Sequence, residues 1–303
     1  MPQPGPLNSI LDAIGHTPLI RLAPLESQGG AQLYGKLESQ NPAGSVKDRT
    51  ALAMVKAAEE SGELQANATI IEATSGNTGI SLAMIAAVRG YSCILVMPED
   101  MSRARRTVLK MYGAEVILTP ADQGMAGAVA HAEQLCQSTP GCFMPRQFEN
   151  RANPAVHEQF TAQEIWDDLE GKLDAFVAGV GTGGTVSGVG QFLRVRDTNI
   201  RIVAVEPRAS AVLSGAEPGL HGIQGLGAGF VPEVFDREVI SQIFTVSDRE
   251  AERMSERLAR EAGIFTGPSA GANVHAAALI AASMKPSQRV VTILCDVGER
   301  YIS

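Results

Sequence analysis

The stretch TIIEATSGNTG occupies residues 69–79 and leads directly into an apolar run at residues 80–88. A short β-branched run, a turn of glycine and threonine, and an apolar segment predict a strand, a turn and a helix. Free backbone N–H groups and the positive end of the helix dipole face such a turn, and threonine hydroxyls add further donors. The stretch therefore predicts a βα unit with an anion-binding turn.

The stretch AFVAGVGTGGT at residues 175–185 has the same character, with a helix expected from about residue 186 to residue 196. Further strand-like runs at residues 92–97, 114–118, 201–205 and 289–295 alternate with helical patterns, which predicts parallel sheets covered on both faces. The helix at residues 248–262 has a capping box at Ser247 and Glu250 and a terminating Gly263. Two anion-binding turns indicate two anionic groups, such as a cofactor phosphate and a substrate carboxylate.

Each glycine-rich turn is, by itself, equally typical of an ordinary βα connection. Residues 179–184 also satisfy the dinucleotide fingerprint, with Glu206 as the ribose acid, but that hypothesis leaves the first turn unexplained. Residues 267–271 match the nucleophile elbow of hydrolases, whose chain order is serine, acid, histidine. The only histidine after Ser269 is His275, in the next predicted helix, so the order argues against a hydrolase.

A third motif, NPAGSVKDR at residues 41–49, places Lys47 where a loop meets a predicted helix. A cation is unfavourable there because the N-terminal end of the helix dipole is itself positive. The position suits a neutral amine or an imine, as Schiff-base chemistry requires. A solvated surface lysine is the alternative, and the two anion-binding turns count against it.

Further motifs complete a resemblance that extends over nearly the whole chain. They are GHTPL at 15–19, QFENRANP at 147–154, IQGLGAGF at 223–230, GPSAG at 267–271 and Asp296. Together with the lysine loop and both turns, they resemble the fold-type II pyridoxal-phosphate (PLP) enzymes, and among them the cysteine synthase (O-acetylserine sulfhydrylase) family. The resemblance implies an α/β fold with two open, twisted, mostly parallel sheets flanked by helices. It also implies a smaller domain at residues 41–150, a larger one at residues 1–40 plus 151–303, and PLP in the cleft between them.

The resemblance also assigns roles to individual residues. Lys47 is expected to be the Schiff-base lysine and the general base and acid, Asn77 to bind the cofactor's 3′-oxygen, and Ser269 to meet the pyridine nitrogen. The residues expected to hold the phosphate are Gly181, Thr182, Gly183, Gly184 and Thr185. The residues expected to bind the amino-acid carboxylate are Thr74, Ser75, Gly76, Thr78 and Gln147. Because the lysine, Asn77, the phosphate loop and Ser269 are all present, a PLP-binding protein without activity is disfavoured.

The substrate hypothesis rests on the glycine-rich, almost uncharged segment at residues 221–230. A phosphoserine-specific enzyme would need an arginine near the leaving group, and the nearest, Arg208 and Arg237, lie outside it. We therefore expect β-replacement of O-acetyl-L-serine with sulfide to give L-cysteine. Cystathionine β-synthase-type replacement on serine with homocysteine is the alternative, because Ala43-Gly44 and Asp48 also occur in that family. A sulfhydrylase that uses another O-activated serine is a further alternative.

Composition excludes several other classes. The net charge is −8, from 25 basic and 33 acidic residues without a sustained basic stripe, which argues against nucleic-acid binding. No signal-peptide pattern or uncharged apolar run of membrane-spanning length is present, so we expect a cytoplasmic protein without a membrane partner. The four cysteines show no paired spacing and are expected to be reduced, and the five scattered histidines predict no metal site. A homodimer and docking by serine acetyltransferase are implied by the resemblance alone.

Overall fold

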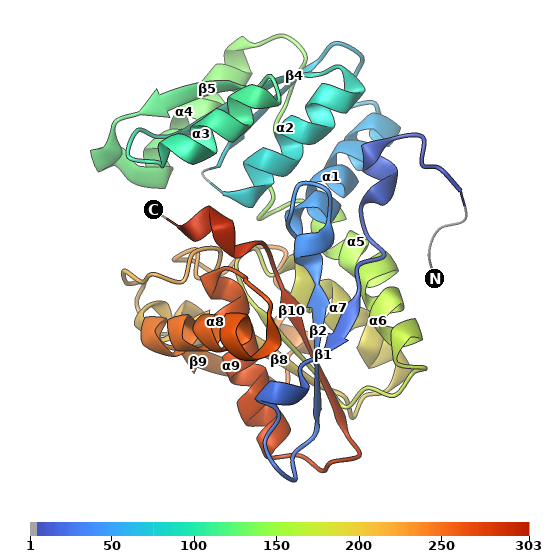
Figure 1. Ribbon diagram of the computed structural model, residues 1–303. Coiled ribbons are helices and arrows are strands. Elements are labelled where there is room, and N and C mark those ends of the chain that lie inside the picture. Colours follow the sequence, from blue (N-terminus) through green and yellow to red (C-terminus); the bar gives the residue numbers. More distant parts are fainter. Residues whose placement is uncertain (1–4, 75, 303) are drawn as a thin grey trace. The chain divides into compact units, whose positions relative to one another are not determined.

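The computed structural model of the protein describes residues 5–74 and 76–302 (Figure 1). The described chain divides into two compact units. Unit 1 contains residues 5–14, 41–43, 47–74 and 76–152, and unit 2 contains residues 15–40, 44–46 and 153–302. Each unit has its own sheet and its own apolar core.

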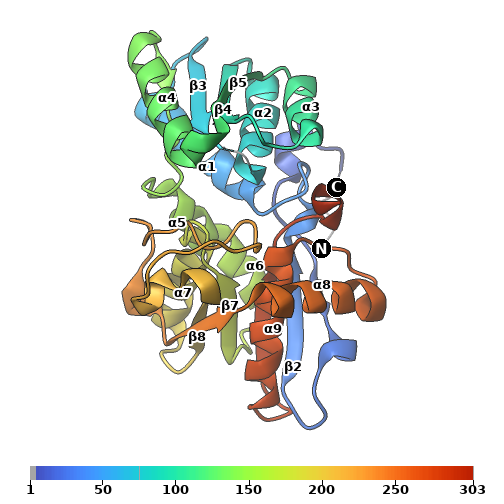
Figure 2. The ribbon, with the colours of Figure 1, turned by 90° about the vertical axis from the view of Figure 1, so that its left-hand side faces the viewer.

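Unit 1 is built on a four-stranded, wholly parallel sheet in the order β5-β4-β3-β6. Its strands are β3 (Thr69–Ala73), β4 (Ser92–Pro98), β5 (Glu115–Thr119) and β6 (Cys142–Phe143). Its helices are α1 (Lys47–Ser61), α2 (Asn77–Arg89), α3 (Arg103–Met111) and α4 (Gly124–Ser138). In Figure 2 the strands β3, β4 and β5 lie between α4 on one side and α2 and α3 on the other.

Alternation along the strands explains these two layers, because successive side chains of a strand point to opposite faces. Ile70 and Leu95 belong to the apolar cluster that contains the buried side chains of α1 and α2. Ile71 and Val96, one residue further along, belong to the cluster with Ala128 of α4. Each strand is therefore covered on both faces, as expected for a parallel sheet.

Unit 2 is built on a six-stranded sheet in the order β1-β2-β10-β7-β8-β9, parallel except for the β1–β2 pair. Its strands are β1 (Leu19–Arg21), β2 (Gln32–Leu37), β7 (Ala175–Gly179), β8 (Arg201–Pro207), β9 (Gln242–Val246) and β10 (Arg289–Leu294). Its helices are α5 (Ala152–Val156), α6 (Ala162–Asp168), α7 (Gly184–Arg196), α8 (Asp248–Ala262) and α9 (Pro268–Ala282). A π-helical segment, His157–Thr161, joins α5 to α6.

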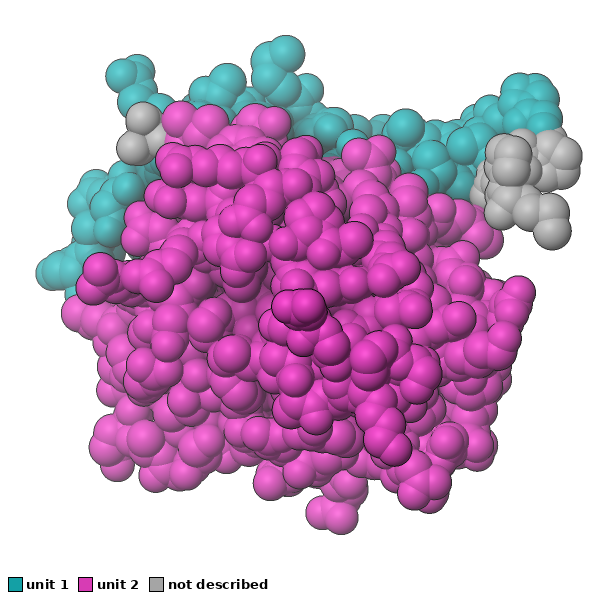
Figure 3. Space-filling model, turned by 60° about the horizontal axis from the view of Figure 1, so that its bottom comes forward, with its two compact units in different colours: residues 1–14, 41–43, 47–152 teal, residues 15–40, 44–46, 153–303 magenta. Residues whose placement is uncertain are grey.

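Short 3-10 turns complete the secondary structure. They lie at Ile10–Ala13, Ala23–Leu25, Glu38–Gln40, Ala121–Gln123, Arg208–Ser210, Val212–Ser214, Arg237–Val239 and Gly298–Tyr301. The first of them places Leu11 in the core of unit 1, which is why residues 5–14 cluster with that unit rather than with residues 15–40 (teal in Figure 3). The two domains that the resemblance implies, residues 41–150 and residues 1–40 plus 151–303, stay a prediction.

Two mostly parallel sheets flanked by helices confirm the expected fold class. The predicted helix at 248–262 is α8, and its capping box is present: Ser247 N donates to Glu250 Oε2 (2.8 Å) and Glu250 N donates to Ser247 Oγ (3.4 Å). Gly263 ends the helix with φ +68°. The helix predicted from about residue 186 to residue 196 is α7, which begins at Gly184, two residues earlier than expected. It starts there because Gly183 adopts φ +83° immediately before it.

The prediction of four reduced thiols is wrong for Cys136 and Cys142, which form a disulfide. Cys136 lies in the last turn of α4, and a turn through Gly141 (φ +68°) returns the chain into β6, where Cys142 begins the strand. This reversal brings the two Cα atoms to 5.4 Å, within the range that a disulfide spans. Cys93 is a buried thiol, and burial raises its pKa to about 12.

Candidate active site

The predicted lysine is the first residue of α1, and the next residue, Asp48, anchors the start of this helix. The Asp48 side chain is fully buried and accepts hydrogen bonds from Ala43 N (2.6 Å) and from Ser81 Oγ (2.5 Å) of α2. Ser81 Oγ also lies 3.1 Å from the carbonyl oxygen of Asn77, the first residue of α2. A buried polar network therefore connects the N-terminal turns of α1 and α2, where Lys47 and Asn77 are found.

The first glycine-rich turn joins β3 to α2 in unit 1. Gly76 precedes the helix and its N–H donates to Thr74 Oγ1 (3.3 Å). Gly79 has no room for a side chain, because an added Cβ would lie 2.9 Å from Thr74 Cγ2. Thr78 Oγ1 donates to Gln147 Oε1 (2.7 Å), and both side chains are buried. Unit 1 thus brings together every described residue predicted to bind the substrate carboxylate; Ser75 lies outside the described residues.

The second glycine-rich turn joins β7 to α7 in unit 2, and its glycines are required by close packing. A Cβ on Gly181 would collide with the carbonyl oxygen of Gly225, and one on Gly184 with the side-chain amide of Asn153. The Asn153 amide donates from Nδ2 to Thr182 Oγ1 (2.9 Å). All five residues predicted to hold a phosphate therefore form one turn with a tightly determined backbone.

A buried histidine supports the far end of this turn. His157, in the π-helical segment, places Nε2 3.3 Å from Thr185 Oγ1 and Nδ1 2.9 Å from Thr161 Oγ1. π-helical segments are rare and frequently occur at functional sites. Neither His157 nor Asn153 was assigned a role from the sequence, although Asn153 lies in the QFENRANP motif.

Ser269 is the second residue of α9 and is buried. Its Oγ lies 3.8 Å from the position that a Cβ on Gly225 would take, and the Gly225 carbonyl abuts Gly181. Gly225 itself has φ +93°, a conformation that glycine adopts without strain. Ser269 and the second glycine-rich turn therefore both lie close to Gly225 within unit 2.

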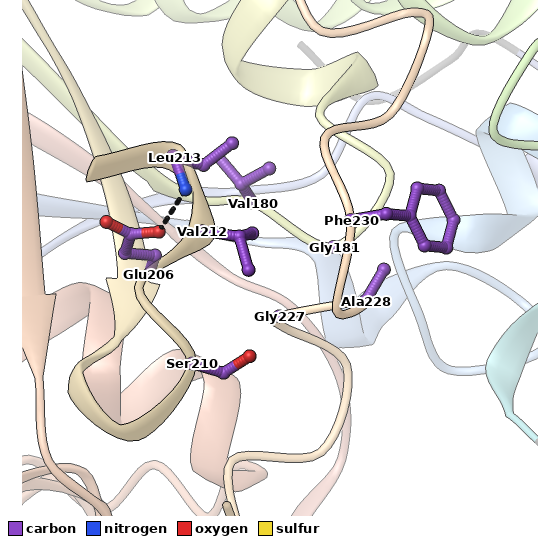
Figure 4. A pocket seen from close by; sticks show the side chains of 9 residues that line it. All are labelled: Val180, Gly181, Glu206, Ser210, Val212, Leu213, Gly227, Ala228 and Phe230. Atoms are coloured by element: carbon purple, nitrogen blue, oxygen red, sulfur yellow. Dashed lines mark hydrogen bonds between the residues drawn. The ribbon is translucent and has the colours of Figure 1, made fainter. Parts of the chain in front are cut away.

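A small pocket lies beside Gly181, with Val212, Leu213 and Phe230 among its lining residues (Figure 4). Glu206 also lines it, but its buried carboxylate accepts from Leu213 N (2.8 Å) and Ser214 Oγ (2.5 Å). These bonds to its own loop occupy the group that a dinucleotide site would need for a ribose. The structure thus agrees with the argument against a dinucleotide fingerprint.

Both turns fit the anionic ligands expected of them. The N-cap residues of α2 and α7 are Gly76 and Gly183, which make no side-chain cap hydrogen bond, and Gly184 N at the start of α7 donates to Thr182 Oγ1 of the turn itself (3.4 Å). Each turn therefore lies at the positive end of a helix dipole. Within residues 5–74 and 76–302, no cluster of three or more His, Cys, Asp or Glu side chains is placed to hold a metal ion. In the same residues, no helix has the length and apolar character needed to cross a membrane.

The chain matches the family described as "Pyridoxal-phosphate dependent enzyme" over residues 10–296, and it belongs to that family. A curated relative, the cysteine synthase of Staphylococcus aureus, is 50% identical over 299 residues, which are 98% of this chain and 96% of that protein. The crystal structure of cysteine synthase (OASS) from Entamoeba histolytica is 40% identical with a TM-score of 0.96, covering 100% of this chain and 91% of that one. A solved O-ureido-L-serine synthase is 46% identical with a TM-score of 0.95, covering 99% and 94%.

Proposed function

We propose that this protein is a cysteine synthase, which makes L-cysteine from O-acetyl-L-serine and sulfide with PLP as its cofactor. The observation with the greatest weight is the 50% identity to a cysteine synthase over 98% of the chain. The local geometry supports it, because each of the two predicted anion-binding turns lies at a helix N-terminus whose N-cap residue is a glycine.

Each predicted cofactor residue would hold a different part of PLP. Gly181–Thr185 would bind the phosphate through backbone N–H groups and threonine hydroxyls, at the positive end of α7. Ser269 would meet the pyridine nitrogen, Asn77 would bind the 3′-oxygen, and Lys47 would form the covalent attachment. When bound, PLP supplies the electron sink that makes the α-proton of an amino acid acidic.

Lys47 moves the proton in this mechanism. Its amine takes the α-proton from the substrate carbon and later returns a proton to the same carbon, so one amine acts as base and then as acid. The hydrogen bonds of Asp48 to Ala43 and Ser81 connect the N-terminal turns of α1 and α2. The backbone that carries the Lys47 side chain is therefore fixed in position. The bonds from Ala43 N and Ser81 Oγ compensate for the burial of the Asp48 carboxyl group.

The substrate is held by its carboxylate at the first turn. Thr74, Ser75, Gly76, Thr78 and Gln147 supply the donors, and the α2 dipole adds a favourable field. The segment at residues 221–230 contains no arginine, which favours a neutral acetate ester over a phosphate ester as the leaving group.

A second candidate is replacement with a nucleophile other than sulfide. The 46% identity to an O-ureido-L-serine synthase supports a different nucleophile on the same scaffold. Ala43-Gly44 and Asp48 support a cystathionine β-synthase-type reaction of serine with homocysteine.

The discriminating experiment supplies the purified enzyme with O-acetylserine, O-phosphoserine or serine, each with sulfide or with homocysteine. We expect the fastest turnover with O-acetylserine and sulfide, measured as cysteine released. Faster reaction of phosphoserine or serine would reject the proposed leaving group, and faster reaction with homocysteine would reject the proposed nucleophile.

We further propose a cytoplasmic homodimer that serine acetyltransferase can bind. Support comes from family resemblance. Sedimentation of the purified protein tests the dimer, and co-sedimentation with serine acetyltransferase tests the docking. A monomer, or two independently sedimenting species, would contradict the respective part.

A further inference from the structure

Gln147 lies in a short irregular segment that follows β6, and its side chain is oriented by Thr78. Gln147 Oε1 accepts from Thr78 Oγ1 (2.7 Å), which fixes the orientation of the amide and identifies Nε2 as its donor atom. A donor is what a carboxylate ligand needs. The orientation of this amide therefore matters for binding an amino acid, and it depends on the backbone just before it.

That backbone adopts an unfavourable conformation. Arg146 has φ +50°, the left-handed region that residues other than glycine rarely occupy. Such conformations persist only where the surroundings determine them. The Arg146 carbonyl is held by the following turn, since it accepts from Glu149 N (2.9 Å) and Asn150 N (3.0 Å).

The Arg146 amide is held from another element, by a buried carboxyl group. Arg146 N donates to Glu72 Oε2 at 2.9 Å, across 74 residues of sequence. Glu72 is in β3 and is only 5% exposed, and its partner on β4 in the strand register is Leu95. A carboxyl group in such surroundings is unfavourable without compensating hydrogen bonds.

Burial raises the pKa of Glu72 to about 7, while the backbone N–H groups of Arg146 and Ala73 act in the opposite direction. Two charged side chains also act on this pKa: Arg146 lowers it and Glu149 raises it. Arg146 Nη2 in turn lies 3.9 Å from Oε1 of Glu133 in α4. A carboxyl group is harder to bury at this position than a leucine side chain would be. What the carboxyl group provides is an acceptor for the Arg146 amide.

We propose that Glu72 is a positioning residue for the amino-acid substrate: it holds the Arg146 amide, and thereby orients the Gln147 side chain for the substrate carboxylate. The inference deepens the proposed function and rests on it. Glu72 does not contact the substrate in this scheme. It acts through a backbone hydrogen bond, so an acceptor atom is required at this position and a negative charge is not.

The test compares two substitutions of the same residue. Glu72→Gln keeps an acceptor, and we expect the KM for O-acetylserine to stay within about twofold of wild type. Glu72→Leu removes the acceptor and should raise that KM about tenfold, the effect of losing one hydrogen bond to a buried group. The KM for sulfide and the bound PLP should change less than about twofold in both, because neither uses Gln147. If Glu72→Leu does not fold, Glu72→Met, which is closer in length, replaces it.

A double-mutant cycle shows whether Glu72 acts through Gln147. In a Gln147→Ala background, Glu72→Leu should add less than about twofold to the KM. Glu149→Gln is the matched control, because Glu149 is an exposed carboxylate of the same segment, and it should leave the KM unchanged.

Two results would overturn the inference alone: an equal KM rise in Glu72→Gln and Glu72→Leu, or an undiminished tenfold effect of Glu72→Leu without Gln147. A wild-type enzyme that binds PLP but forms no cysteine would overturn the proposed function, and this inference with it.

Discussion

The two glycine-rich turns begin from the same sequence pattern and are completed in different ways. The turn after β7 is determined by its backbone: Gly181 abuts the Gly225 carbonyl, and Gly184 abuts the Asn153 amide. The turn after β3 is completed by side chains, since Thr78 bonds to Gln147 and the segment before Gln147 bonds to Glu72. The second turn is therefore sensitive to any side chain added to its own glycines, whereas the first turn is sensitive to the side chains around it.

The largest expected effect comes from replacing Lys47, the proposed base and acid. Lys47→Ala should lower turnover by roughly 10³-fold or more, because general acid–base catalysis and the covalent attachment are lost together. Cysteine release measures the loss. In the wild type, borohydride reduction should fix PLP on the peptide that contains Lys47, and a label on another lysine would contradict the assignment.

The next effect concerns the buried carboxyl group beside the first turn. The pKa of Glu72 is about 7 in the folded state and 4.5 in the unfolded chain, so the folded protein binds this proton more tightly. The corresponding stabilisation, about 3 kcal/mol, is fully present below pH 4.5 and is lost as the pH rises through 7. Relative to Glu72→Gln, the wild type should therefore lose stability towards pH 8 in denaturant titrations.

The control for this pH effect is Glu149→Gln, which removes an exposed carboxylate from the same segment. Between pH 5.5 and pH 8 its unfolding free energy should show nearly the same pH dependence as the wild type, because Glu149 has the smallest of the effects on the Glu72 pKa. A constant difference between wild type and Glu72→Gln from pH 5.5 to pH 8 would contradict the assignment of this titration to Glu72.

A smaller effect tests whether the second turn is determined by its backbone. Gly184→Val would force a side chain into the Asn153 amide, and overpacking of this kind typically costs about 2 kcal/mol. We expect PLP affinity to fall roughly thirtyfold, measured by fluorescence titration of the apoprotein. Gly62→Ala is the control: an added Cβ meets nothing within 4 Å, but φ +78° strains an alanine there, so this variant should lose stability and keep the PLP affinity.

The smallest effect tests the side-chain character of the first turn. Thr78→Ala removes the hydroxyl that orients Gln147 and should raise the KM for O-acetylserine about tenfold, with PLP content unchanged. Loss of PLP rather than substrate affinity would show that the two turns do not divide their ligands as proposed.

Local patterns predict much of this molecule. The β-branched runs, the glycines of both turns and the capping box at Ser247 each act over a few residues, and the structure contains all of them. The same patterns do not reveal that Asn153 and His157 support the second glycine-rich turn. Each bonds to a threonine of that turn that lies nearly thirty residues away in the sequence. They also miss the disulfide, because the separation of six residues between Cys136 and Cys142 matches no recognised cysteine motif.

The sequence by itself determined the class of fold, the two glycine-rich turns and the lysine at the start of a helix, because periodicity, glycine and helix capping are short-range effects. Only the tertiary structure decided that β6 pairs with β3, with Cys142 opposite Thr69. That strand order is a long-range choice, made by the packing of whole elements on the sheet. It brings Gln147 to Thr78 across 69 residues, and the Arg146 amide to a carboxyl group that no local pattern distinguishes from an ordinary strand residue.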